Sequence, residues 1–162
     1  MLTPWRADDG QITLLVIGYV AIAAVLLVVG VDVSTVFLAR RSLSSAADAA
    51  ALAGAQGVDR AALYAGSDLR CGSRLPLDRS RASELAGLSI DDSRSALAHH
   101  FKSLDPPQTS VSADTVDVQL SGEVGVPFGH VIGWLDPSRP DGRVHVVVTS
   151  HARSPVNGGG DC

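Results

Sequence analysis

The stretch that decides the fold is GQITLLVIGYVAIAAVLLVVGVDVSTVFLARRSLSSAADAAALAGAQ, which spans residues 10–56. Its first part, residues 12–31, is a run of 20 residues that contains no charged side chain. As an α-helix, such a run rises about 30 Å, which is the thickness of the hydrocarbon core of a bilayer. We therefore expect one transmembrane helix over residues 12–31.

Two other structures can contain an apolar run of this kind. A cleaved signal peptide has an apolar region of about 7 to 15 residues, and a small-residue cleavage site follows closely. Here the nearest site of that type, Ala51–Ala53, begins 20 residues beyond the run. A helix buried in a soluble protein usually keeps a polar stripe, whereas this run is apolar on all sides. The membrane span is the better interpretation.

The charged residues that follow the run mark its boundary with water. Asp32 comes first, and Arg40 and Arg41 follow after a mostly apolar segment. A carboxylate at the centre of a bilayer costs about 2.5 to 3.5 kcal/mol, but at the end of a span it can reach the headgroup layer. Asp32 therefore marks the boundary, which is the interpretation we favour, or it pairs with a basic group of a neighbouring subunit.

The next segment, residues 42–55, is rich in alanine, the best helix former, and no proline lies between Trp5 and Leu75. The simplest structure is one continuous helix from Ile12 to Gly57, in which the membrane span continues into an Ala-rich stalk. Small or apolar residues recur at three- and four-residue spacing on one face of the stalk: Leu43, Ala46 or Ala47, Ala50, Ala53 and Gly54. Such a face allows close packing against copies, partners or the chain's own domain.

The order of these features is itself informative. Asp32 ends the span, Arg40 and Arg41 follow, and the run AADAAALAGA occupies residues 46–55. This order resembles the N-terminal region of Tad/Flp pilus-assembly proteins of the TadE/TadG type. Members of that family are bitopic membrane proteins of bacterial pilus and secretion machinery, related to type IV pilins in their N-terminal helix. The resemblance implies other pilus or secretion components as partners.

The resemblance also implies a single-pass protein of the cytoplasmic membrane whose C-terminal domain is extracytoplasmic. The basic residues that flank the span, Arg6 on one side and Arg40 and Arg41 on the other, point weakly to the opposite orientation. Pilin-like members that are processed carry a Glu at the fifth position after the cleaved Gly. The fifth residue after Gly10 is Leu15, and this departure favours the TadG-like branch, which resembles an anchored accessory component.

The expected organisation is an N-terminal tail over residues 1–11, the transmembrane helix and Ala-rich stalk over residues 12–57, one small α+β domain over residues 58–156 and a flexible tail over residues 157–162. Two short helices are predicted, Ser80–Leu88 and Asp92–Leu104, and the second begins at an N-cap. The N-cap is Asp91 or Asp92.

Farther along, from Val116 to Phe128, the even positions carry apolar residues, apart from Gly122, and the odd positions between them are mostly polar. This period of two predicts a half-buried strand, or two strands broken near Gly122. Arg143–Ser150 predicts a second strand, antiparallel to the first. The fold class is therefore α+β: a long N-terminal transmembrane helix and stalk, then a small domain with short helices and an antiparallel sheet, in a pilin-like layout.

Charge and composition exclude several functions. The net charge is -4, and neither the first 57 residues nor the remainder is basic, so nucleic acid is not expected as a partner. The five histidines are too scattered for a metal site, and no nucleophile elbow or phosphate-binding loop occurs. We expect no catalytic residues, cofactor or metal. Cys71 and Cys162 are candidates for a disulfide if the domain lies in an oxidising compartment.

The sequence thus favours a structural or accessory component of a Tad-type pilus assembly or a related secretion system. Its partners would be the lipid bilayer, other pilus components or pilin-like proteins, and other copies in a homo-oligomer. The residues expected to act at the membrane end and in helix packing are Asp32, Arg40, Arg41, Ala46, Ala50, Ala53 and Gly54. The alternative is a single-pass membrane-anchored extracytoplasmic binding module that is unrelated to pili.

Overall fold

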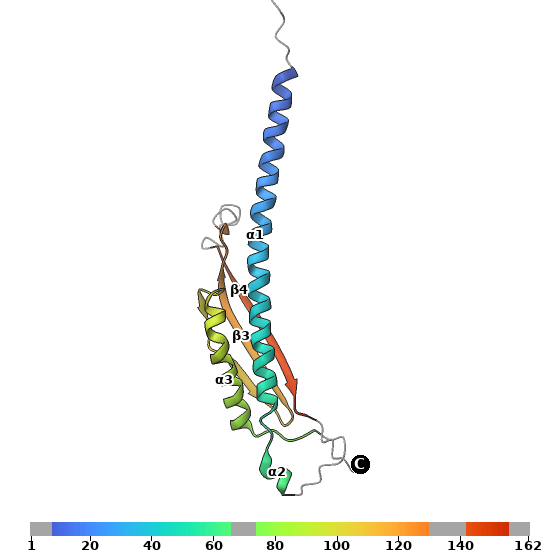
Figure 1. The fold of residues 1–162 in the computed structure, drawn as a ribbon, viewed down its shortest axis with the longest axis vertical. Coiled ribbons are helices and arrows are strands. Elements are labelled where there is room, and N and C mark those ends of the chain that lie inside the picture. Colours follow the sequence, from blue (N-terminus) through green and yellow to red (C-terminus); the bar gives the residue numbers. More distant parts are fainter. Residues whose placement is uncertain (1–7, 66–73, 130–141, 156–162) are drawn as a thin grey trace, which may run out of the picture.

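A computed structural model describes residues 8–65, 74–129 and 142–155. Its dominant element is the helix α1, Asp8–Ala55, a rod of 48 residues that runs most of the length of the molecule (Figure 1). This confirms the predicted continuous helix, which begins a few residues earlier than expected. The first half of α1 projects beyond the rest of the structure, and the second half packs against a small domain.

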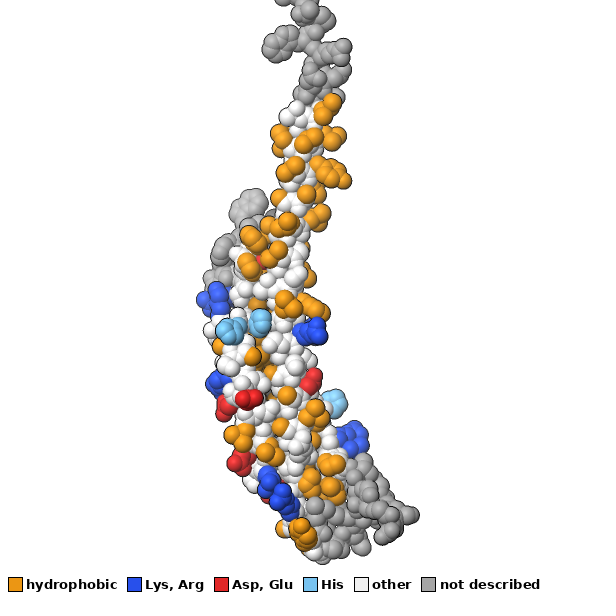
Figure 2. All heavy atoms as spheres, viewed as in Figure 1, with side chains coloured by type: hydrophobic (Ala, Val, Ile, Leu, Met, Phe, Trp, Pro, Cys, Tyr) orange, Lys and Arg blue, Asp and Glu red, His pale blue; other side chains and the backbone are white. Residues whose placement is uncertain are grey.

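The two halves of α1 differ in their surroundings. Large apolar side chains between Ile12 and Val31 are exposed, and the most apolar part of the helix has no buried residue. In the space-filling view hydrophobic side chains are spread over the visible face of this upper part, whereas the visible Lys and Arg side chains lie on the lower part (Figure 2). Burial begins at Asp32 and continues through Ala39 and Leu43. The first half of α1 is therefore an apolar span long enough to cross a bilayer, and the second half is part of a folded domain.

Two further helices follow α1. The short helix α2, Arg60–Tyr64, is capped by Asp59. The longer helix α3, Arg79–Ala98, begins at the N-cap Asp78, whose carboxylate accepts hydrogen bonds from the backbone amides of Ser80 and Arg81. The hydroxyl of Ser80 donates to the same carboxylate, and this bond, followed by the backbone bonds, lowers the pKa of Asp78 from its ordinary value.

The prediction of two short helices in this region was wrong, because α3 is one uninterrupted helix of 20 residues. Its buried residues continue through the predicted break: Ala82, Ala86, Ile90 and Leu97. Packing of this face against α1 outweighs the capping tendency of Asp91 and Asp92, which lie in the middle of the helix and not at its N-cap. The helix also ends earlier than predicted, so Phe101 and Leu104 lie beyond it.

The sheet is antiparallel throughout and is organised around β3, Thr115–Gly125. β4, Arg143–Arg153, pairs with the whole length of β3, from Thr115 opposite Arg153 to Gly125 opposite Arg143. The other edge of β3 is shared by two short strands, β1, Ser103–Leu104, and β2, Gln108–Val111. The predicted antiparallel pair is therefore confirmed, and two short strands extend it.

The alternation in the sequence fitted either one strand or two strands broken near Gly122. The structure has one strand, because β3 passes through Gly122 without a break. At Gly122 a Cβ atom would lie 2.7 Å from the carbonyl oxygen of Ser103, so the glycine permits β1 to approach β3 closely. The apolar alternation continues to Phe128, but the strand ends at Gly125.

α1 and α3 lie side by side on one face of the sheet, as Figure 1 shows, and the core lies between these two layers. The buried face of β3 supplies Val116, Val118, Leu120 and Val124, and α1 supplies mostly alanines. The opposite face of β3 carries partly exposed polar side chains, as expected for an antiparallel sheet with one solvated face. The result is a two-layer α+β domain on a membrane-length helix, which confirms the predicted fold class.

Candidate functional site

The junction between the apolar span and the domain is built around Asp32. Its side chain is 3% exposed, and its Oδ1 accepts a hydrogen bond from the backbone amide of Phe128 at 3.1 Å. Phe128 follows the end of β3, so this bond ties the tip of the sheet to α1. Among the residues that the structure describes, Oδ2 of Asp32 has no hydrogen-bond partner.

An open groove of about 380 Å³ lies beside Asp32. We call it the Asp32 groove, and its other lining residues are Val33, Val36, Phe37, Arg40, Val126 and Val144. Val33, Val36, Phe37 and Arg40 belong to one side of α1. Val126 directly follows β3, and Val144 lies near the start of β4. The walls of the groove are therefore apolar, with one carboxylate inside and one guanidinium among its lining residues.

The two arginines after Asp32 are both exposed, so they remain available to solvent or to headgroups. Arg40 lines the Asp32 groove, whereas Arg41 lines a second, wider groove between α1 and α3. The structure therefore brings Asp32 and Arg40 to the same surface, but Arg41 points to a different one.

The small-residue face of the stalk packs inside the chain. Ala46, Ala50 and Gly54 are buried, and Ala53 is only partly buried. A Cβ atom at Gly54 would lie 3.0 Å from Cγ1 of Val116 and 3.1 Å from the carbonyl oxygen of Ala82, so β3 and α3 both approach the helix there. The close approach that small residues allow is used for the chain's own sheet and α3.

Sequence reasoning missed a second carboxylate contact on α1. The hydroxyl of Ser150, a buried residue of β4, donates a hydrogen bond to Oδ1 of Asp48. Asp48 is the one charged residue between Arg41 and Gly57 in the sequence, and that isolation within an alanine run was the available signal. Asp32 and Asp48 thus fix α1 to the sheet at two levels, in addition to apolar packing.

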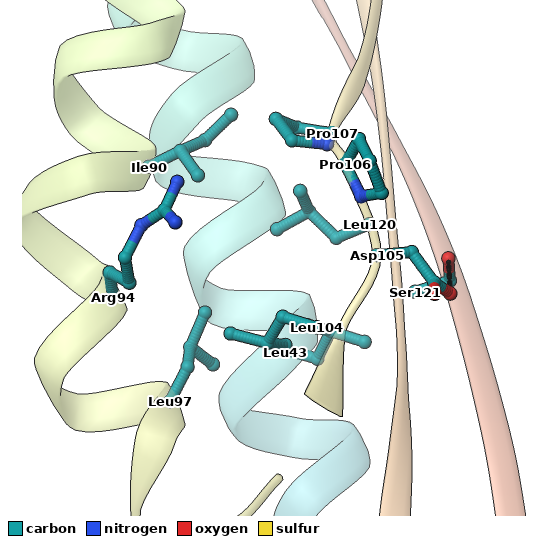
Figure 3. Close-up of a pocket in the computed structure, with 10 residues that line it drawn as sticks. All are labelled: Leu43, Ile90, Arg94, Leu97, Leu104, Asp105, Pro106, Pro107, Leu120 and Ser121. Carbon is teal, nitrogen blue, oxygen red and sulfur yellow. Dashed lines mark hydrogen bonds between the residues drawn. The ribbon is translucent and has the colours of Figure 1, made fainter. Parts of the chain in front are cut away.

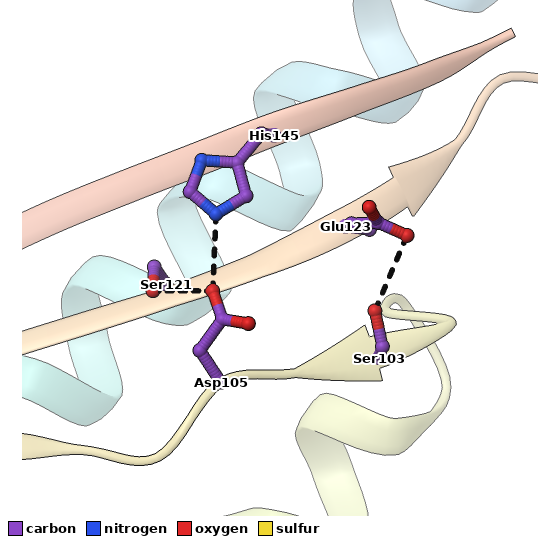
Figure 4. A network of polar contacts seen from close by, with 5 residues as sticks. All are labelled: Ser103, Asp105, Ser121, Glu123 and His145. Atoms are coloured by element: carbon purple, nitrogen blue, oxygen red, sulfur yellow. Dashed lines mark hydrogen bonds and ion pairs between the residues drawn. The ribbon is translucent and has the colours of Figure 1, made fainter.

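The solvated face of the sheet carries a small network of polar contacts (Figure 4). The hydroxyl of Ser121 donates to Oδ2 of Asp105 at 2.6 Å, and Nε2 of His145 lies 3.0 Å from the same oxygen. The hydrogen bond from Ser121, followed by that from His145, lowers the pKa of Asp105. The network joins the segment after β1 to β3 and β4, and it holds no nucleophile next to a base in a closed site.

We predict that Asp105→Asn makes the domain less sensitive to acid. Because the pKa of Asp105 is below its ordinary 3.8 in the folded chain, its ionised form stabilises the fold fully above pH 3.8. That contribution is lost as the pH falls through the lowered value. Urea midpoints measured above and below pH 3.8 should therefore differ more for the natural chain than for the variant. Asp117→Asn is the control, because Asp117 lies on the solvated face of β3 but outside the network around Asp105. This variant should retain the natural acid response.

A third groove, of about 290 Å³, lies between α3 and the segment that links β1 to β2 (Figure 3). Its apolar lining includes Leu43, Leu97 and Leu120, and the link contributes Pro106 and Pro107. The guanidinium of Arg94 stands beside it but is paired with Asp91 at 3.0 Å. This groove can accommodate an apolar side chain, but the described residues around it include no free charge that would select a ligand.

The described parts of the chain contain no cluster of three or more residues suited to hold a metal ion. Of the histidines, His145 is engaged with Asp105, and His151 lies on the same exposed face of β4. Cys71 and Cys162 lie outside the described residues, as does the predicted flexible tail over residues 157–162. The disulfide therefore stays a prediction.

The fold and the junction at Asp32 define the class of the protein: a membrane-anchored protein whose apolar helix continues into a small helix-and-sheet domain. Residues 10–57 match the family described as Flp pilus-assembly TadE/G-like, so this N-terminal segment is TadE/TadG-like, as the sequence resemblance implied. The match coincides with α1 and does not distinguish TadE from TadG. Comparison with curated proteins and with solved structures gave no match.

Proposed function

We propose that the chain is a membrane-anchored structural or accessory component of a Tad-type (Flp) pilus assembly or a related secretion system, on the TadG-like branch. One observation carries this proposal: the family match over residues 10–57 coincides with α1, the described helix that is long and apolar enough to span a bilayer. The absence of a Glu at position 15 supports the accessory role over that of a processed pilin.

The proposed mechanism is association through the membrane helix and display of the domain to partners. The protein would sit in the cytoplasmic membrane with the domain on the extracytoplasmic side, and its role would be structural rather than catalytic. The stalk face is occupied by the chain's own sheet, so association with pilus components or with other copies would use the surfaces of α1 that remain exposed, including residues 12–31 and Leu52.

Replacing Val25 and Leu26 together with arginine should abolish membrane insertion and pilus production. Each arginine near the middle of a span costs about 2.5 to 3.5 kcal/mol on the insertion scale. The assay is complementation of a deletion strain, with membrane sedimentation and surface pili as readouts. Leu88→Arg is the matched control, because Leu88 is similarly exposed but lies on α3, outside both the span and the exposed surface of α1. Normal piliation in the deletion strain would reject the proposed function.

Orientation has its own experiment. After brief treatment with a membrane-impermeant reductant to open any disulfide, a membrane-impermeant thiol reagent should label Cys71 or Cys162 in intact cells. That result would place the domain outside the cytoplasmic membrane. Labelling that appears only after lysis would reverse the proposed topology. A chain that is anchored and extracytoplasmic but dispensable for pili would favour the alternative, a membrane-anchored binding module. The apolar groove beside α3 would then be its candidate binding surface.

A further inference from the structure

The unsatisfied oxygen of Asp32 is the starting point. Asp32 is only 3% exposed, and its Oδ2 has no hydrogen-bond partner among the described residues. A buried carboxylate oxygen without a partner is strongly unfavourable. Ionisable groups at membrane depth are usually paired with one another. The burial of Asp32 therefore indicates a binding partner for that oxygen.

The Asp32 groove gives such a partner its route. Apolar side chains of α1 remain exposed beyond Asp32, at Val33, Phe37 and Leu38, before Arg40 is reached. Arg40 lies eight residues farther along the helix, or about 12 Å at 1.5 Å per residue. The groove therefore opens on the part of α1 where apolar side chains are still exposed, between the span and Arg40. We call this part the apolar belt. The occupant of the groove must combine an apolar stem with a cationic end.

Lysine and arginine side chains have this form, because their methylene stems lie along apolar surfaces while the charged end reaches a partner. A zwitterionic lipid fits less well. Its ammonium group lies on the water side of its phosphate, so an ammonium bound to Asp32 would place the phosphate deeper in the apolar belt.

A second copy of this chain fits no better. Two copies that span one bilayer in parallel bring Asp32 level with Asp32, and the nearest basic residue of the neighbour, Arg40, lies about 12 Å farther out. A helix packed along the exposed first half of α1 would, in contrast, meet the tip of the sheet at Val126 and Val144, at the level of the carboxylate.

We propose that the Asp32 groove binds an arginine or lysine side chain from a membrane-spanning helix of a different protein. This inference rests on the membrane anchoring proposed above, but it does not depend on the partner being a pilus component. Oδ1 of Asp32 would keep the backbone amide of Phe128 while Oδ2 pairs with the incoming cation. The sheet tip and the partner helix would then be held to the same carboxylate.

The test is site-specific photocrosslinking of the full chain in its native cells. A benzoylphenylalanine in place of Phe37, inside the groove, should crosslink to a peptide from a membrane-spanning helix that contains Arg or Lys. The matched position is Leu38, which is the next residue, is also exposed, and does not line the groove. The same adduct should be absent or much weaker there.

Charge is tested by Asp32→Asn, which keeps an oxygen for the amide of Phe128 but removes the negative charge. The crosslink from position 37 should fall by about tenfold or more, as for loss of one partner of a buried charge pair. Asp48→Asn, which removes a carboxylate from the same helix outside the groove, should leave the yield unchanged. Replacing the identified basic residue of the partner with Gln should cause the same loss without altering this chain. Combining Asp32→Lys with replacement of that basic residue by Asp should restore the crosslink.

An unchanged yield in Asp32→Asn, a crosslink to lipid or to a second copy only, no crosslink at all, or a partner helix without a basic residue would each overturn the inference. Sedimentation separates this failure from that of the proposed function. If the chain is in the membrane and supports piliation, yet the adduct is independent of Asp32, only the cation site is wrong. A chain that is absent from the membrane fraction would reject both.

Discussion

Leu43→Ala is expected to lower the free energy of unfolding of the domain by about 2 to 5 kcal/mol. Leu43 is 0% exposed and is among the largest fully buried side chains of α1, where that helix meets the sheet and α3. Its side chain also lines the groove beside α3. Truncation therefore removes apolar contacts and extends that groove into the core, and the cost depends on how far α1 and α3 can close the space.

The control for this prediction is another leucine of the same helix. Leu52 is 61% exposed, so Leu52→Ala should change stability by no more than about 0.5 kcal/mol. The measurement is pulse proteolysis of the full chain in detergent across a urea series, since it reports unfolding of the domain and not of the span. Equal loss of stability in the two variants would show that the packing of α1 on the sheet is not as described.

The parts of the fold that the sequence predicts are those with long, regular periodicity. The apolar run, the uninterrupted alanine segment and the period-two alternation correctly predict α1, β3 and β4. β1 and β2 span two and four residues, which is too short for a periodic signal, and they form because β3 offers them an edge. The length of α3 was missed for a related reason. Asp91 and Asp92 are local N-cap signals that predict the start of a second helix, and packing of the helix face on α1 overrides them.

The contacts of the candidate site were not predicted from the sequence. Asp32 was recognised as the charge at the end of the span, and its partner is the backbone amide of Phe128, 96 residues away. Asp48 contacts Ser150 across 102 residues. Neither partner carries a charge or belongs to a motif, so no feature of the sequence indicates it. Such contacts follow from the tertiary placement of α1 on the sheet.

The alanine face illustrates the same limit from the opposite direction. Its spacing correctly indicates a close helix contact, but the identical pattern serves a neighbouring helix or the chain's own sheet. The structure distinguishes the two, because a Cβ atom at Gly57 would lie 2.7 Å from Cα of Ala82 in α3, and Gly54 lies against Val116 in β3. The small residues therefore set the distance between α1 and its own domain.

Ala50→Leu is accordingly expected to destabilise the domain by about 1 to 3 kcal/mol through overpacking. Ala50 is 0% exposed, and its neighbours Ala46, Ala47 and Ala51 on α1 are also buried, so there is little free space for a larger side chain. Ala49→Leu is the matched control, because Ala49 is exposed and the substitution in the same helix is chemically identical. It should leave the free energy of unfolding within about 0.5 kcal/mol of that of the natural chain.

The two variants also separate internal packing from association with other proteins. If the buried face acts inside the chain, Ala50→Leu lowers the urea midpoint, and any loss of co-purified pilus components accompanies that destabilisation. If the face acted between proteins, Ala50→Leu would lose the co-purified components at an unchanged midpoint, and the structure described here for the stalk would be wrong. Ala49→Leu lies on a surface that remains open to partners. A selective loss of association in that variant, without a change in stability, would place the contact on the exposed side of α1.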